Sequence, residues 1–278
     1  KELVGGALSF YAAAAVAKTG GVHIFVAEDR DAAAYLLNDF YNLLDEKQVY
    51  FFPSSYKRSA AYGAEDAQGV VQRTTAMNAV RGFTKGYLVV CTYPEALAER
   101  VVDAATLQRD TIAVKLGDKI SIAVLEDALA DANFTRVDFV YEPGQYSVRG
   151  GIVDVFSYSE SKPYRIDFFG DEVDSIRRFN ISSQLSADKL DRVEIVPNLN
   201  AGEAPRVSFV QFAGSSATCW FYDADYVLRR VNDLRRKVLA DMEEPGQIDR
   251  LLTSRNVLLR DMAGNSVVAG RSGRLSRS

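Results

Sequence analysis

The chain has 278 residues, of which 47% are hydrophobic and 25% charged, as expected for a folded protein of about two domains. Its formal net charge is −4 at pH 7, and this disfavours nucleic acid as the main partner, because nucleic-acid-binding proteins usually carry a basic surplus. Its two cysteines exclude a disulfide framework. We see no signal peptide, and the apolar run 12–17 is too short to span a bilayer. We therefore predict a cytoplasmic protein without membrane contact.

Predicted strands and helices alternate over residues 1–110. Nearly continuous apolar runs are typical of buried strands, and they lie at 22–26, 49–52 and 87–91. Apolar residues at helical spacing predict helices at 8–17, 31–44 and 64–80. Repeated strand–helix–strand units with all-apolar strands predict a parallel sheet that is covered on both faces.

The pattern changes near Thr111. A predicted helix at 120–130 precedes segments in which polar and apolar residues alternate, at 148–156, 163–169, 172–179 and 192–196. Glycine-containing turn signals lie between these segments, at 143–144, 150–151 and 170–171. Alternation of period two with short turns predicts a small α+β domain with an antiparallel sheet at 111–198.

After residue 198 the first pattern returns, with apolar and helical runs at 207–212, 218–222 and 223–239. The simplest interpretation is a discontinuous α/β domain, formed by 1–110 and 199–278, into which the α+β domain is inserted. The tail 270–278 consists of Gly, Ser and Arg with a single Leu, and we expect it to be either frayed or a cut end.

The opening segment stands where a nucleotide-binding α/β domain would place its phosphate loop. Such a loop needs a glycine-rich turn, a lysine for charge, and a serine or threonine for the metal. Counted from Gly5, the places for the end of the glycine-rich turn, the lysine and the serine or threonine hold Phe10, Tyr11 and Ala12. Counted from Gly6, each place moves by one residue and again none holds the residue type that the loop needs. We therefore predict that this degenerate loop binds no cofactor.

Other candidate chemistry is sparse. His23 is the only histidine and lies in an apolar strand, so we expect a satisfied core residue rather than a catalytic base. Cys91 also ends an apolar run and is expected to be a buried small hydrophobe. The acidic residues of segment 170–174 fit a solvated hairpin turn. No spacing of Cys and His fits a metal site, so we predict no catalytic and no metal-binding residues.

Two stretches carry a specific family resemblance. Residues 142–156 read EPGQYSVRGGIVDVF, and residues 163–179 read PYRIDFFGDEVDSIRRF, followed by SSQ at 182–184. Together they resemble the second domain that the excinuclease component UvrB shares with transcription-repair coupling factors. The match is strong over 111–198 and looser over the flanking α/β segments.

Two departures separate this chain from UvrB. UvrB has an intact phosphate loop and a long tyrosine-rich hairpin that clamps DNA, whereas here the loop is degenerate and segment 53–69 is too short and too poor in tyrosine. The chain therefore resembles the amino-terminal region of the coupling factors. That resemblance implies a P-loop NTPase-like (RecA-like) parallel-sheet domain, split into parts 1a (1–110) and 1b (199–278), with domain 2 (111–198) inserted.

The resemblance also implies a function. An amino-terminal module of this bacterial family recruits the excinuclease component UvrA to lesions where RNA polymerase has stalled, in transcription-coupled nucleotide excision repair. It implies no enzyme activity for these 278 residues. The full-length family is an ATP-dependent DNA translocase that engages RNA polymerase and double-stranded DNA, and its ATP and magnesium belong to motor domains elsewhere. The alternative is a UvrB-like, ATP-dependent fragment that binds damaged DNA.

Alternation along 164–169 predicts two faces for this strand. One face is apolar, and the other presents Arg165 with Phe169, a combination that interface hot spots favour. The resemblance implies that Arg149, Arg165 and Phe169 bind UvrA. Arg177 and Arg178 are further candidates for the rim of this surface. The residues alone leave an alternative open, in which Arg165 pairs with a neighbouring Asp or Glu within the sheet and Phe169 belongs to the core.

Overall fold

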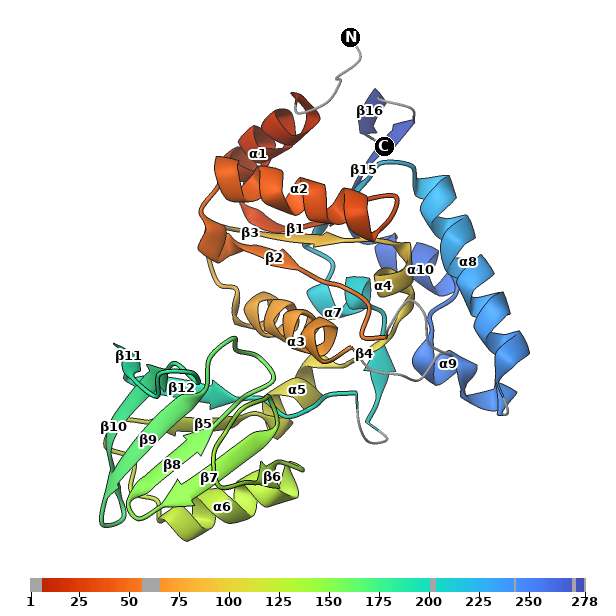
Figure 1. Cartoon of the computed structure of the whole chain (residues 1–278). Coiled ribbons are helices and arrows are strands. Elements are labelled where there is room, and N and C mark those ends of the chain that lie inside the picture. Colours follow the sequence, from red (N-terminus) through yellow and green to blue (C-terminus); the bar gives the residue numbers. More distant parts are fainter. Residues whose placement is uncertain (1–6, 57–65, 201–203, 243, 272–273, 278) are drawn as a thin grey trace. The chain divides into compact units, whose positions relative to one another are not determined.

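The computed structural model describes residues 7–56, 66–200, 204–242, 244–271 and 274–277, and side chains up to residue 269. The chain divides into two compact units (Figure 1). Unit 1 combines residues 1–103 with 204–278, and unit 2 is the intervening segment 104–203.

Unit 1 is built on a six-stranded sheet, in which five strands run parallel. The order across the sheet is β16 (Arg274–Arg277), β15 (Ser266–Arg271), β14 (Thr218–Phe221), β1 (Gly21–Val26), β3 (Tyr87–Thr92) and β2 (Val49–Phe51). Ile24, Val89 and Val90 are completely buried, as the apolar runs predict for strands covered on both faces. The parallel sheet is confirmed. Residues 274–277 of the tail are not frayed, because they form β16, which pairs antiparallel with β15.

Helices cover both faces of this sheet. Helices α1 (Ala7–Thr19) and α2 (Arg30–Leu43) lie on one side, and α3 (Ala67–Gly82) lies on the other (Figure 1). Asp29 caps α2 by accepting a hydrogen bond from the Ala32 amide, and Asp223 caps α8 in the same way. The remaining elements of unit 1 are α4 (Pro94–Ala98), α7 (Phe209–Ala213), α8 (Ala224–Asp241), α9 (Ile248–Leu251), α10 (Arg255–Met262), the 3-10 turns Glu46–Gln48 and Pro245–Gln247, and the paired strands β4 (Val101–Val102) and β13 (Arg206–Val207).

His23 joins two strands of unit 1 that lie far apart in sequence. Its Nδ1 accepts a hydrogen bond from Trp220 Nε1 at 3.0 Å, and its Nε2 donates to the Gly20 carbonyl at 2.8 Å. Both ring nitrogens are thereby satisfied in the neutral form, and burial lowers the pKa of His23. The predicted core role of this residue is confirmed, since only 2% of its surface is exposed.

Unit 2 contains a second six-stranded sheet, in the order β11 (Ser186–Lys189), β10 (Glu172–Phe179), β9 (Tyr164–Phe169), β8 (Ile152–Val155), β7 (Gln145–Arg149) and β6 (Thr135–Arg136). Neighbours are antiparallel except β6 and β7, which run parallel. Strand β5 (Ile112–Lys115) pairs separately with β12 (Arg192–Ile195). Helices α5 (Ala104–Asp110) and α6 (Ile122–Asp131) complete the unit.

Two sequence expectations for this region are corrected. The segment 148–156 is not one strand, because the chain turns back at Gly150, whose φ of +60° favours glycine. The pattern change at Thr111 also misses α5, which belongs to unit 2 rather than to the first domain. Along the sequence, the boundaries between the two units therefore lie at 103/104 and 203/204, a few residues from the predicted boundaries at 110/111 and 198/199.

One face of the unit 2 sheet forms the core of the unit. Its apolar side chains, among them Val153, Tyr164 and Ile166, pack with Leu125 and Leu129 of α6. The same cluster includes apolar residues of the β5–β12 pair, namely Val114, Val193 and Ile195. The cluster contains the predicted apolar side of β9, since Phe168 packs against it as well. The opposite side of the sheet carries the charged residues of β7, β8 and β9, together with Ile152 and Phe169.

Acidification should destabilise unit 1 through His23. Because the folded pKa lies below the unfolded value of 6.5, the unfolded chain binds the proton more readily. The stability that neutral His23 provides is thus complete above the unfolded pKa and is lost as the pH falls through the folded pKa. Urea unfolding at about pH 7.5 and pH 5.5 should show a larger loss for the wild type than for His23→Gln. Equal losses in both proteins would contradict the assignment.

Candidate protein-binding face

The side of the unit 2 sheet that faces away from its core carries a row of charged residues. We call this the outer face and define it by Arg149 on β7, Asp154 on β8, and Arg165, Asp167 and Phe169 on β9. Asp154 is the register partner of Arg165, and Arg149 is opposite Ile152, two positions before Asp154 on the same side. Three neighbouring strands therefore place one carboxylate between two guanidinium groups.

Asp154 is the centre of this arrangement. Its side chain is only 2% exposed, yet both of its oxygens are engaged by cations. Arg165 Nε donates to Oδ1 at 2.7 Å, and Arg165 Nη2 donates to Oδ2 at 2.9 Å. Arg149 Nη2 donates to the same Oδ2 at 2.6 Å. A carboxylate removed from water needs such partners, and this one has a bidentate pair and a second cation.

Arg149 lies between Asp154 and the loop that follows β6. Its Nη1 donates to the Asp138 carbonyl at 3.1 Å, and its guanidinium carbon lies 4.8 Å from the centre of the Phe139 ring. Its side chain remains 36% exposed. Arg149 is therefore fixed by neighbours on two sides while it stays accessible to a partner.

Arg165 is more enclosed than Arg149, with a side chain that is 14% exposed. Besides its two bonds to Asp154, it donates to the backbone oxygen of Gln184 and to the Gln184 side-chain oxygen, and it lies over the Phe179 ring. The hydrogen bond to Asp154 raises the pKa of Arg165, so it stays charged. The alternative in which Arg165 pairs within the sheet describes its actual contacts.

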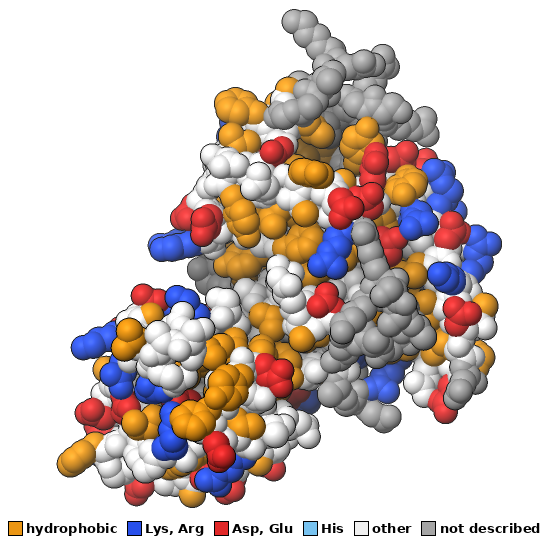
Figure 2. All heavy atoms as spheres, viewed as in Figure 1, with side chains coloured by type: hydrophobic (Ala, Val, Ile, Leu, Met, Phe, Trp, Pro, Cys, Tyr) orange, Lys and Arg blue, Asp and Glu red, His pale blue; other side chains and the backbone are white. Residues whose placement is uncertain are grey.

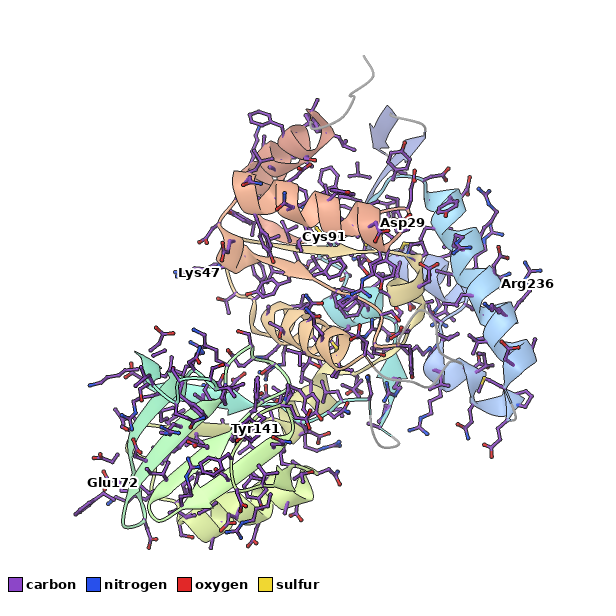
Figure 3. The ribbon with its side chains drawn as sticks, viewed as in Figure 1. Asp29, Lys47, Cys91, Tyr141, Glu172 and Arg236 are labelled. Atoms are coloured by element: carbon purple, nitrogen blue, oxygen red, sulfur yellow. The ribbon has the colours of Figure 1, made fainter. Side chains whose placement is uncertain are left out.

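Phe169 is not a core residue. It is 84% exposed and ends β9, next to the turn at Gly170, whose φ is +62°. Its register partner is Glu172, which Figure 3 labels at the tip of the β9–β10 hairpin. The exposed ring lies on the same side of β9 as Arg165, and an aromatic side chain beside arginines is the combination that interface hot spots favour.

The remaining charges of the face are largely paired. Asp167 accepts from Arg177 and from Ser175, and Arg178, on the other side of β10, pairs with Glu160 at 3.1 Å. Figure 2 accordingly shows acidic, basic and apolar side chains intermingled over unit 2.

Three residues that contribute to the outer face were not predicted as site residues from the sequence, namely Asp154, Phe139 and Gln184. A lone carboxylate within the apolar run 152–156 was the available signal for Asp154. The other two residues come from loops, where no periodic pattern points to a neighbour.

The predicted degenerate phosphate loop is only partly visible. Gly5 and Gly6 lie outside the described residues. Phe10, Tyr11 and Ala12 lie within α1, where the two aromatic rings are exposed and Ala12 is buried. These positions offer no cation and no aliphatic hydroxyl to a phosphate group.

Both cysteines and one ion pair of unit 1 are buried. Burial raises the pKa of the Cys219 thiol to about 12 and raises that of Cys91 as well, which removes thiolate character at neutral pH. Glu99 and Arg73 form a buried pair at 3.7 Å, and Ser55 donates to Glu99. Among the described residues, no group of three His, Cys, Asp or Glu side chains could hold a metal ion, and no helix is long and apolar enough to cross a membrane.

Part of unit 2 is similar to a known protein family. Residues 112–200 match the family described as the UvrB interaction domain. This range covers every strand of the outer face and the α6 side of the sheet.

Individual relatives are transcription-repair-coupling factors. The chain is 27% identical to the Bacillus subtilis protein over 196 residues and 26% identical to the Escherichia coli protein over 197 residues, in each case 70% of this chain. The Haemophilus influenzae protein is 35% identical over 101 residues, 36% of this chain. The matched segments span only 16%, 17% and 9% of these relatives. The resemblance to the amino-terminal region of a coupling factor is thus confirmed.

The structure predicts contrasting stability effects at two outer-face positions. Asp154→Ala should cost about 3 kcal/mol of unfolding free energy, because it leaves the guanidinium groups of Arg149 and Arg165 without the buried carboxylate that both bind. Phe169→Ala should change stability by less than about 0.5 kcal/mol, since the ring has few contacts to lose. Chemical denaturation of both variants measures the contrast. A large loss for Phe169→Ala would show that the ring packs within the protein.

Proposed function

We propose that unit 2 is a protein-binding module that engages the excinuclease component UvrA through Arg149, Arg165 and Phe169. The observation that carries the proposal is the exposed Phe169 ring, held at a hairpin tip on the same sheet face as two arginines that a buried carboxylate orders. The match to the UvrB interaction domain and the names of the relatives support a role in transcription-repair coupling. In that role the module recruits UvrA to stalled RNA polymerase in transcription-coupled nucleotide excision repair.

The physical character of the face suits a protein partner. Arginine offers a planar fork for carboxylates, and an exposed aromatic ring offers rigid apolar area at low entropic cost. Arg165 and Arg177 already pair with Asp154 and Asp167, so little net charge remains for a polyanion. A nucleic-acid surface would need several uncompensated cations.

Unit 1 is proposed to be a P-loop NTPase-like (RecA-like) scaffold without nucleotide binding. Its support is the five-stranded parallel sheet together with Phe10, Tyr11 and Ala12 at the positions where a phosphate loop needs a cation and a hydroxyl. ATP with magnesium, double-stranded DNA and RNA polymerase are proposed as ligands of the longer protein in the bacterial cytoplasm. The UvrB-like fragment remains the alternative that ATP and DNA binding would favour.

Binding to purified UvrA, measured by calorimetry, tests the protein-binding role. Wild-type chain should bind, and Arg165→Ala/Phe169→Ala should bind at least about 10-fold more weakly, a loss of about 1.4 kcal/mol. The expected loss has two sources, the removed ring and the disturbed Arg149–Asp154 pair.

A matched control is available elsewhere on unit 2. Arg136 is an exposed arginine paired with Glu126, and Val124 is an exposed apolar residue of α6. Arg136→Ala/Val124→Ala therefore removes similar classes of side chain away from the outer face, and it should bind UvrA like the wild type. If this control loses as much affinity as the outer-face variant, the surface is misplaced. If the wild type fails to bind at all, the proposed partner is wrong.

Nucleotide binding is tested by thermal unfolding with and without ATP and magnesium. A ligand that binds only the folded state raises the melting temperature, by an amount that grows with its concentration above Kd. We expect no shift for this chain at millimolar ATP, because the loop positions lack the groups that hold phosphate and metal. A clear shift, together with binding of damaged DNA, would replace the module by the UvrB-like alternative.

A further inference from the structure

The two arginines of the outer face differ in how many of their donors are already used. A guanidinium group has five N–H donors. Within the described part of the chain, Arg165 makes four hydrogen bonds, two to Asp154 and two to Gln184. Arg149 makes two, one to the Asp138 carbonyl and one to Asp154. Most of the unused donor capacity of the pair therefore belongs to Arg149.

Charge and exposure are distributed in the same way. Two guanidinium groups share one carboxylate, so the cluster of Arg149, Asp154 and Arg165 keeps a single positive charge. Asp154 makes a bidentate pair with Arg165 but only one hydrogen bond with Arg149, and the Arg149 side chain is 36% exposed against 14% for Arg165. The uncompensated charge is thus concentrated where a partner can reach it.

Arg149 is also held in place before any partner arrives. Asp154 binds its Nη2, the Asp138 carbonyl binds its Nη1, and the Phe139 ring lies against its guanidinium group. A side chain that is already fixed avoids much of the entropy loss that ordering a free arginine at an interface would bring. A planar fork with unused N–H groups is suited to a carboxylate.

From this asymmetry, and resting on the proposed function, we propose that Arg149 receives one carboxylate of an aspartate or glutamate on the partner, and that Asp154 is the positioning residue for it. Asp154 neutralises Arg165 and holds Arg149 in the orientation that the partner carboxylate meets. Arg165 supports this contact by fixing Asp154 through its bidentate pair. The partner's carboxylate is then the second acid for the two arginines, because the cluster itself contains only Asp154.

A double-mutant cycle for binding to UvrA tests this coupling. Dissociation constants are measured for wild type, Arg149→Ala, Asp154→Asn and the double variant. Each single change should weaken binding about 10-fold or more, and the double variant should be no weaker than Arg149→Ala alone, because Asp154 acts through Arg149. If the two losses multiply instead, Asp154 does not position Arg149 and the proposal is overturned.

Glu126→Gln is the matched control, since Glu126 is an acid paired with Arg136 on the α6 side of unit 2, away from the outer face. It should bind within about 2-fold of wild type, because its partners are not those of Arg149. A loss as large as that of Asp154→Asn would mean that removing any paired acid of unit 2 weakens binding equally, and this also overturns the proposal.

Lysine variants keep the test decisive if Asp154→Asn does not fold. Arg149→Lys keeps the charge but removes the fork, so it should weaken binding about 10-fold with little change in melting temperature. Arg165→Lys should lower the melting temperature while its affinity, measured on folded protein, falls less than that of Arg149→Lys. The reverse order refutes direct contact by Arg149. Absence of wild-type binding refutes the proposed function itself. If the wild type binds but the affinity losses of Arg149→Ala and Asp154→Asn multiply in the double variant, only this inference is refuted.

Discussion

The carboxylate of Asp154 is the interaction on which the outer face depends. It is buried in the side of a sheet that otherwise faces solvent, and a charge so placed is tolerated only if cations and hydrogen bonds replace the water it has lost. Strand β8 lies between β7 and β9, so its two neighbours supply Arg149 and Arg165 from opposite directions. The carboxylate thus fixes which way both arginines lie, although it contributes almost nothing to the surface itself.

This constraint also ties the binding face to the register of the sheet. A shift of one residue in β8 would turn Asp154 into the apolar core and Val153 or Val155 out of it. The apolar side of β9 selects the same register through Tyr164 and Ile166, which pack toward α6. Core packing and the ion cluster therefore select one pairing together, and Phe169 is carried to the hairpin tip as a consequence.

Patterns of apolar and polar residues along the sequence predicted much of the structure. Contacts between residues of different strands could not be predicted from those patterns. Period-two alternation placed Arg165 and Phe169 on the side opposite Ile166, because the side-chain direction in a strand depends on position alone. The pairing of Arg165 with Asp154 depends on register between strands, and period alone left it as one of two possibilities. The link from His23 to Trp220 joins residues 197 positions apart. Strands of two residues, such as β6 and β13, are too short to show a period at all.

The balance of paired and unpaired groups on the outer face argues for a partner with mixed chemistry. A phosphate backbone rewards every accessible cation equally and gains little from an aromatic ring that does not stack on a base. Here Arg165 and Arg177 are already neutralised by acids of the same sheet. Among the residues that the structure describes, the most exposed large apolar side chain is the phenyl ring of Phe169. Such a face gains most from a surface that offers an apolar pocket for the ring beside a carboxylate for Arg149, because burying the ring provides free energy that the paired ions cannot. Proteins provide such surfaces, and the ion cluster then determines which of them fit by excluding those that place a second cation against Arg149.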